Sequence, residues 1–215
     1  VNYASKSKEI WKVPCPIFVR GIAMEGGIGP VAGSSHHSLY YRMPGVKIVS
    51  PMTPGEYKNV YKSFLKDDTV YYVSEHRGSY TNKDEIKNLY FKNPDFVIFA
   101  ISITRFAAKK AIEDLFKEGI KVSLVNILWI KPLKISKKSY DNLKESKFGG
   151  VVMDDDYTTG VAKSIANDIN IKTNKKMITM GLKDRTAGTA KRLDNLPPSS
   201  SEIYKRIKDI ISNNV

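Results

Sequence analysis

The sequence is poor in cysteine and has no long apolar run. Its 215 residues include a single cysteine, Cys15, which excludes an intrachain disulfide framework and a cysteine-rich zinc site. No apolar stretch approaches the ~18 residues that a membrane span requires, and the first residues lack the apolar segment of a signal peptide. We therefore expect no membrane partner and a cytoplasmic protein, with an organellar matrix as the alternative location. The sequence opens with Val1 and not with methionine, so we expect a preceding segment.

Arginine is scarce as well, although the net charge is +13. Only seven of the 35 basic residues are arginine, and they are scattered along the sequence without alternating with aromatic residues. Recognition of nucleic acid requires a concentrated basic patch, so we expect no nucleic-acid partner. The composition, with 41% hydrophobic and 27% charged residues, is that of a globular protein. The length suits one large domain or two modest ones.

The second half of the sequence alternates apolar strands with helices. Residues 96–101 form a continuous apolar run of strand length, and residues 105–117 carry apolar side chains at helical spacing. The alternation continues over the following segments: 122–127, 150–153 and 177–180 as strands, and 136–144 and 161–169 as helices. A final helix follows Ser199, which forms a capping-box pattern with Glu202. Because this alternation is typical of a mainly parallel sheet with helices on both faces, we predict an α/β domain over residues 94–215.

The first half predicts fewer elements. A helix is expected after Thr53, which is a good cap. The expected strands are residues 16–21, 46–50 and 70–74. These strands are too few for an independent doubly wound sheet, and the polar residues 82–94 are typical of a linker. We therefore predict that residues 1–93 do not form a doubly wound domain of their own, with a boundary near residues 93–94.

Two adjacent histidines, His36 and His37, follow a glycine-rich segment at residues 26–33. That segment resembles a dinucleotide-binding loop only superficially, because Pro30 removes an amide donor and no helix follows directly, so we interpret it as a flexible loop. Adjacent side chains on an extended segment point to opposite sides, so at most one histidine faces a given pocket. There it can donate a proton to a substrate or bind an oxyanion. A histidine that serves only in hydrogen bonding is the alternative.

Three consecutive aspartates, Asp154 to Asp156, follow a predicted strand. Carboxylates in this place suit a magnesium site, but carboxylates also commonly cap the next helix. Because Thr158, Thr159 and Gly160 follow after Tyr157, we favour the helix cap.

Five segments carry a resemblance to a known family. Residues 16–21 read PIFVRG, the pair at residues 37–38 follows the glycine-rich segment, and residues 44–54 read PGVKIVSPMTP. Residues 67–75 and residues 119–133, which read GIKVSLVNILWIKPL, complete the set. In this order and spacing the sequence resembles the β subunit of the thiamin-diphosphate-dependent 2-oxo acid dehydrogenases, within the transketolase superfamily. The last segment resembles the start of the transketolase C-terminal domain.

The resemblance implies a fold, an activity and partners. Residues 1–93 would be the C-terminal part of a pyrimidine-binding domain, and residues 94–215 a transketolase C-terminal domain. The complete assembly would bind thiamin diphosphate and Mg²⁺ and catalyse the oxidative decarboxylation of a 2-oxo acid, with transfer of the acyl unit to a lipoyl group. The implied partners are an α-type subunit or an N-terminal half that carries the diphosphate site, further copies in a homo- or hetero-oligomer, and a lipoyl-bearing acyltransferase.

The resemblance also implies roles for particular residues. His37 matches the family's substrate-side histidine and is the implied catalytic residue. Phe64, Leu65, Asp67 and Thr69 fall where some β subunits present oxygens to a structural K⁺. Thr69 stands in place of the usual asparagine.

The family's cofactor residues are missing from the sequence. The glutamate that activates thiamin diphosphate and the aromatic residue that stacks on its pyrimidine would lie upstream of Val1. Neither Glu25 nor Glu75 aligns with that glutamate, and the diphosphate and Mg²⁺ motif, GDG with a distant asparagine, is absent as well. We therefore assign no cofactor-binding residue to this chain and expect the chain alone to be inactive.

Two alternatives stay open beside a β-type subunit. One is the C-terminal portion of a split transketolase, or of a deoxyxylulose-phosphate-synthase-like enzyme, that acts on sugar phosphates. The other is a noncatalytic assembly module that keeps the fold and lacks the chemistry. The wording of residues 44–51 and the pair His37-Ser38 favour the β-type subunit over the split transketolase-like enzyme.

Overall fold

The computed structural model describes residues 1–25, 28–29 and 33–213, and these divide into two compact units. Unit 1 comprises residues 1–85, 128–134 and 186–194, and unit 2 comprises residues 86–127, 135–185 and 195–215. Unit 2 thus begins a few residues before the boundary predicted near residues 93–94. Unit 1 also includes two later segments that the sequence pattern did not indicate. Most of the glycine-rich segment lies outside the described residues.

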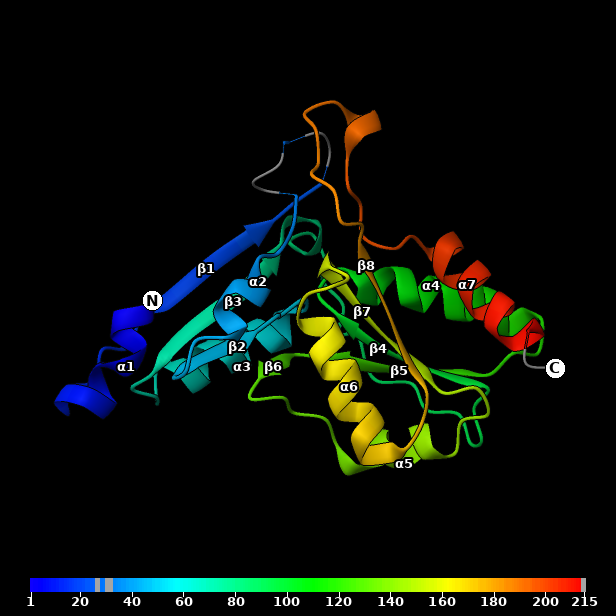
Figure 1. Cartoon of the computed structure of the whole chain (residues 1–215), viewed down its shortest axis with the longest axis horizontal. Helices are drawn as coiled ribbons and strands as arrows, with labels where there is room; N and C mark the ends of the chain where they lie inside the picture. The colour runs from blue at the N-terminus through cyan, green and yellow to red at the C-terminus, as the bar shows by residue number, and fades with distance from the viewer. Residues whose placement is uncertain (26–27, 30–32, 214–215) are drawn as a thin grey trace. The chain divides into compact units, whose positions relative to one another are not determined.

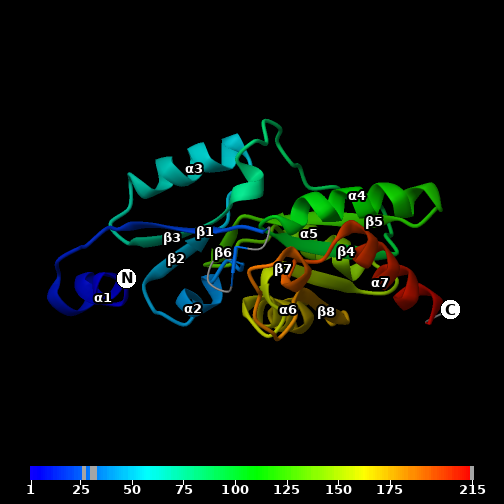
Figure 2. The same cartoon turned by 90° about the horizontal axis from the view of Figure 1, so that it is seen from above.

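Unit 1 contains a four-stranded sheet in the order β1-β3-β2-β6. Its main elements are α1 (Asn2–Trp11), β1 (Phe18–Ala23), α2 (His37–Tyr41), β2 (Val46–Val49), α3 (Pro54–Phe64), β3 (Val70–His76), a 3₁₀ helix η1 (Arg77–Ser79), β6 (Trp129–Lys131) and a 3₁₀ helix η2 (Lys191–Leu193). Strands β1, β2 and β3 are parallel, and β6 adds to β2 in the antiparallel sense. Figure 2 shows α2 and α3 on opposite sides of this sheet. One of the two inner strands, β3, is buried at every position.

The predicted start of α3 is confirmed. Thr53 is the N-cap and its side chain accepts from the amide of Glu56, with Pro54 in the first turn. The carboxylate of Glu56 accepts from the amide of Met52, the residue before the cap, at 2.9 Å. These contacts satisfy amide groups that a helix N-terminus leaves without an internal partner.

Unit 2 contains a four-stranded parallel sheet in the order β5-β4-β7-β8. Its elements are β4 (Phe96–Ile101), α4 (Thr104–Lys117), β5 (Val122–Ile127), α5 (Lys137–Lys144), β7 (Gly150–Tyr157), α6 (Val161–Thr173), β8 (Met177–Leu182) and α7 (Ser200–Ser212). Figure 1 shows β4 and β7 side by side in the middle of this sheet, and Figure 2 shows α4 and α6 on its opposite sides. The predicted α/β fold class, with a mainly parallel sheet and helices on both faces, is confirmed.

Both faces of strand β4 are buried. Phe96 and Ile98 belong to a hydrophobic cluster that also contains side chains of α4 and α7. Val97 and Phe99 alternate with them and are also fully buried, at 0% exposure. Successive side chains of a strand point to opposite faces, so a continuous apolar run is what a sheet covered on two sides requires.

The structure corrects the interpretation of the three aspartates. Asp154 to Asp156 lie inside β7 and do not cap the next helix. Helix α6 begins after Gly160, which makes no side-chain cap hydrogen bond. Strand β7 therefore extends beyond its apolar run. Its aspartates accept hydrogen bonds from Ser102 and from backbone amides of the strand itself.

Helix α7 allows a direct test of the fold of unit 2. The predicted capping box of Ser199 and Glu202 is present, and Ile207 is 1% exposed in the cluster with α4. Ile207→Ala should lower the free energy of unfolding by about 2–5 kcal/mol, because it leaves a cavity in a packed core. The exposed Lys205 supplies the control Lys205→Ala, which should stay within about 0.5 kcal/mol. Equal losses in denaturant titrations would contradict this packing of α7.

Candidate functional site

His37, the implied catalytic residue, is the first residue of α2. It is 0% exposed, and its Nδ1 lies 3.0 Å from Oγ of Ser74 on β3. The preceding residue, His36, is the N-cap of α2 with a φ of 56°. The two histidines therefore do not lie on an extended segment, and that expectation is wrong. The two rings have different partners, because Nδ1 of His36 lies 3.2 Å from Oγ of Ser34 and Nδ1 of His37 faces Ser74.

Strand β3 anchors the segment that carries His37. The hydroxyl of Tyr72 donates to the backbone carbonyl of Ser35 at 3.1 Å. The ring of Tyr72 stacks on that of Tyr40, with centroids 4.1 Å apart. Together with the contact between Ser74 and His37, these interactions hold both ends of the short helix α2 on one strand. The hydrogen-bonding role predicted as the alternative for His37 has a defined partner here, and the substrate role stays a prediction.

The next residue of β3, Glu75, is a buried carboxylate with fixed partners. It is 1% exposed and accepts two hydrogen bonds of 2.7 Å from Arg20 on β1. The hydroxyl of Tyr80 donates a third at 2.6 Å, and burial together with this bond raises the pKa of Tyr80 to about 12. These three bonds engage both carboxylate oxygens of Glu75. Glu75 therefore links β1 to β3, and the expectation that it is not the activating glutamate stays a prediction.

A cavity of about 310 Å³ opens beside Arg20 in unit 1. Tyr57, Tyr80, Thr53 and Asn82 are among the residues that line it. Burial raises the pKa of the Tyr57 phenol well above its ordinary value, so this hydroxyl stays protonated. The cavity lies where β2 and β3 end, which is the edge of a parallel sheet at which ligands commonly bind.

The four residues of the predicted K⁺ site lie in and around the turn between α3 and β3. The Asp67 carboxylate already accepts from Thr69, Tyr71 and the Lys47 ammonium. Burial would raise the pKa of Asp67, but these hydrogen bonds outweigh it and lower the pKa to about 2. The carbonyl of Phe64 is engaged by the amide of Asp67. The contacts of Asp67 therefore do not suit a second cation, and the K⁺ assignment stays a prediction.

The third histidine, His76, ends β3. Its Nδ1 accepts from the amide of Gly78 at 3.1 Å, and its Nε2 lies 3.8 Å from the carboxylate of Glu25. The residue is 4% exposed, and burial lowers its pKa to about 4. His76 is thus a neutral structural imidazole at neutral pH.

The aspartates of β7 form a second group of buried carboxylates, in unit 2. Asp154, Asp155 and Asp156 are between 0% and 3% exposed. Ser102 donates to Asp155 at 2.7 Å, and Asp154 and Asp156 each accept from the next backbone amide. Charged residues are rarely buried without partners, so the end of β7 is a polar site within an apolar sheet.

Three of these contacts were missed in the sequence: Arg20 with Glu75, Ser74 with His37, and Lys47 with Asp67. The available signal was a polar residue inside an otherwise apolar strand, as in VSEH of β3 and FVRGI of β1. That signal marks residues that need a partner. It does not identify the partner, because strand pairing decides which residues meet.

A known protein family matches about half of the chain. A family model described as "Transketolase, C-terminal domain" matches residues 88–199. The chain therefore belongs to the transketolase C-terminal domain family.

Within the described residues, no helix combines the length and the apolar character that crossing a membrane requires.

Sequence relatives include β subunits of 2-oxo acid dehydrogenases. The chain is 28% identical over 171 residues to a pyruvate dehydrogenase E1 component subunit beta from Gracilaria tenuistipitata var. liui, which covers 72% of this chain and 51% of the relative. It is 28% identical over 148 residues to the 2-oxoisovalerate dehydrogenase subunit beta of Bacillus subtilis, with 60% and 42% covered. The chain spans about half the length of the relatives it matches. The resemblance to this group is confirmed.

Solved structures show the same fold. A chain titled "Split gene transketolase, inactive beta4 tetramer" aligns with a TM-score of 0.69 and 14% identity, covering 97% of this chain and 74% of that one. A transketolase mutant from Pichia stipitis aligns with a TM-score of 0.68 and 14% identity, covering 92% of this chain and 30% of that one. At this identity the likeness concerns the fold alone.

The environment of His76 predicts a pH dependence of stability. The pKa is about 4 in the fold against an ordinary 6.5, so the unfolded chain takes up the proton first as the pH falls. Neutral His76 therefore makes its full contribution to the free energy of unfolding above about pH 6.5. This free energy decreases toward pH 4, by about 3 kcal/mol at most. His76→Asn keeps an acceptor for Gly78 and cannot be protonated. The free energy of unfolding of the wild type, relative to that of this variant, should therefore decrease as the pH is lowered from about 6.5 to 4. A difference between the two proteins that does not change with pH would contradict the assignment.

Proposed function

We propose that the chain is the β-type part of a thiamin-diphosphate-dependent 2-oxo acid dehydrogenase. The observation that supports this most is the similarity to β subunits, which covers 72% of the chain. That share exceeds what residues 88–215 contain, so the similarity extends beyond the C-terminal domain into unit 1. The proposed reaction is the oxidative decarboxylation of a 2-oxo acid with acyl transfer to a lipoyl group.

The open edge of the unit 1 sheet supports a partner segment. Strand β1 pairs with β3 on one side and is the last strand of its sheet in the described part of the chain. Ile22 on β1 is 44% exposed, and Ile17 just before it is 37% exposed. Parallel sheets are normally buried, and an edge strand with apolar side chains is a template for another strand. We assign this edge to the half of the β-type protein that the chain does not span.

In this proposal the described residues of the chain supply no complete cofactor site. Thiamin diphosphate, held with Mg²⁺ in the complete assembly, would supply the electron sink for decarboxylation. The buried glutamate of unit 1, Glu75, is already held by Arg20 and Tyr80. We therefore assign both the diphosphate site and the activating glutamate to the partner segment and an α-type subunit.

His37 is assigned to the substrate. In the proposal its imidazole donates a hydrogen bond to the carboxylate or the developing oxyanion of the 2-oxo acid. The contact with Ser74 at 3.0 Å orients the ring. An imidazole held by a second group is better placed to act on one substrate atom.

The remaining partners and the location follow from the same proposal. Acyl transfer requires a lipoyl-bearing acyltransferase, and a split active site requires a homo- or hetero-oligomer. We place the assembly in the cytoplasm or an organellar matrix.

Two other functions are weaker. A split transketolase acting on sugar phosphates is favoured by one observation: a chain titled as a split gene transketolase aligns with 97% of this chain. Its 14% identity is half that of the β subunits, so we rank it second. A noncatalytic assembly module would keep the fold, and the reconstitution below distinguishes it.

Calorimetry tests the need for partners. The 215-residue chain should show no saturable, Mg²⁺-dependent binding of thiamin diphosphate, because its buried glutamate is engaged and the diphosphate motif is absent. Binding should appear when the remaining β-type segment and an α-type subunit are added. A clear isotherm with the chain alone would refute this division of the site. No binding in the complete mixture would favour the noncatalytic module.

Kinetics of the reconstituted enzyme test His37. His37→Ala should lower kcat/KM for the 2-oxo acid by about 10²- to 10⁴-fold, the usual range for a positioned acid or base. Thiamin diphosphate affinity should stay nearly unchanged. His36→Ala is the matched control and should have a much smaller effect, because the His36 side chain makes no cap hydrogen bond to α2 and contacts Ser34 instead. Equal damage from both variants, or a main effect on cofactor affinity, would show the assignment to be wrong.

A further inference from the structure

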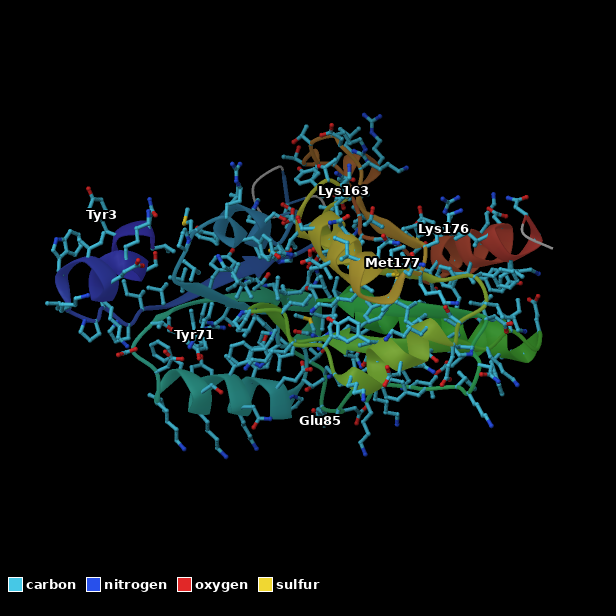
Figure 3. All side chains as sticks on the ribbon, turned by 60° about the horizontal axis from the view of Figure 1, so that its bottom comes forward. Tyr3, Tyr71, Glu85, Lys163, Lys176 and Met177 are labelled. Carbon is cyan, nitrogen blue, oxygen red and sulfur yellow. The ribbon has the colours of Figure 1, made fainter. Side chains whose placement is uncertain are left out.

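Lys47 and Tyr71 lie next to each other on neighbouring strands. Lys47 of β2 is the register partner of Tyr71 of β3, so both side chains lie on the same face of the sheet. Tyr71 contacts Phe64 of α3 edge-on, with ring centroids 5.5 Å apart, and Figure 3 shows it on the α3 side of the sheet. The turn that follows α3 brings Asp67 to the same place.

Asp67 is surrounded by donors. Its Oδ1 accepts from the amide of Thr69 at 3.1 Å and from the Thr69 hydroxyl at 2.8 Å. Its Oδ2 accepts from the Tyr71 hydroxyl at 2.9 Å and from Nζ of Lys47. A carboxylate offers about four lone-pair directions, so four donors occupy its capacity. The threonine at position 69 fits this arrangement, because both its amide and its hydroxyl are used.

The charge at this place is already balanced. The Lys47 side chain is 31% exposed and that of Asp67 is 17% exposed, so the pair is partly shielded from water. Its mutual attraction is stronger than at an open surface. A K⁺ ion would have to displace the ammonium or lie beside it, and two cations on one carboxylate repel each other.

We propose that the Lys47 ammonium takes the place of a monovalent cation at the α3–β3 turn. The turn is then fixed by a covalently attached cation, and unit 1 keeps its structure without K⁺. Lys47 also lies 5.5 Å from the centre of the Tyr71 ring. One ammonium therefore contacts both the carboxylate of the turn and the aromatic ring that packs on α3. This proposal does not depend on the reaction that the assembly catalyses.

Thermal unfolding of the full chain in different salts tests the proposal. The wild type should have the same midpoint, within about 1 °C, in potassium chloride and in tetramethylammonium chloride of equal ionic strength. Lys47→Met leaves a half-buried carboxylate without its cation and should lower the midpoint by roughly 5–10 °C. In this variant potassium chloride should restore several degrees in a saturable manner, because the vacated position accepts K⁺.

Two further variants make the result specific. The double variant Lys47→Met with Asp67→Asn carries no charge at the turn, so its midpoint should not depend on K⁺. Lys62→Met removes an exposed lysine of α3 and should behave like the wild type. A saturable, K⁺-specific rise of the wild-type midpoint would overturn the proposal in favour of a bound ion, and this holds even where Lys47→Met fails to fold. Loss of stability in Lys47→Met without any rescue by K⁺ would also overturn it.

Discussion

The arrangement of unit 1 depends on the burial of strand β3. All seven of its residues are buried, yet most of them carry polar groups, and a buried polar group without a partner is costly. Each of these groups is therefore tied to another element. Ser74 meets His37 of α2, and Glu75 meets Arg20 of β1. Strand β3 in this way fixes the positions of the elements around it.

The same constraint connects the proposed site with the proposed cation substitute. Tyr71 binds the turn after α3 through Asp67, and Tyr72 binds the segment before α2 through Ser35. The helices on the two faces of the sheet are thus held by neighbouring residues of one strand. A change at Lys47 is expected to affect stability first, because it lies on the face of α3. His37 lies on the opposite face of the sheet, in α2. A change at His37 is expected to affect substrate turnover, because we assign its imidazole to the substrate.

The sequence predicted unit 2 better than unit 1, for a physical reason. Strands β4 and β5 have the bounds that their apolar runs indicated, because a sheet covered on both faces requires continuous apolar strands. Strand β6 was missed, since it joins the unit 1 sheet from a distant part of the chain. The histidine pair was placed on an extended segment, because the left-handed conformation of His36 has no signal in its neighbours. The aspartates of β7 were read as a cap, because their partner Ser102 lies on another segment.

The central claim is that this chain completes a split active site for a 2-oxo acid. The most direct measurement is CO₂ release from pyruvate or a branched-chain 2-oxo acid by an assembly of this chain, the remaining β-type segment and an α-type subunit. Cleavage of a ketose phosphate is measured in parallel. The account predicts CO₂ release that requires all three parts, with no comparable turnover of the sugar phosphate. Turnover of the ketose phosphate alone, or CO₂ release that does not change when this chain is omitted, would contradict it.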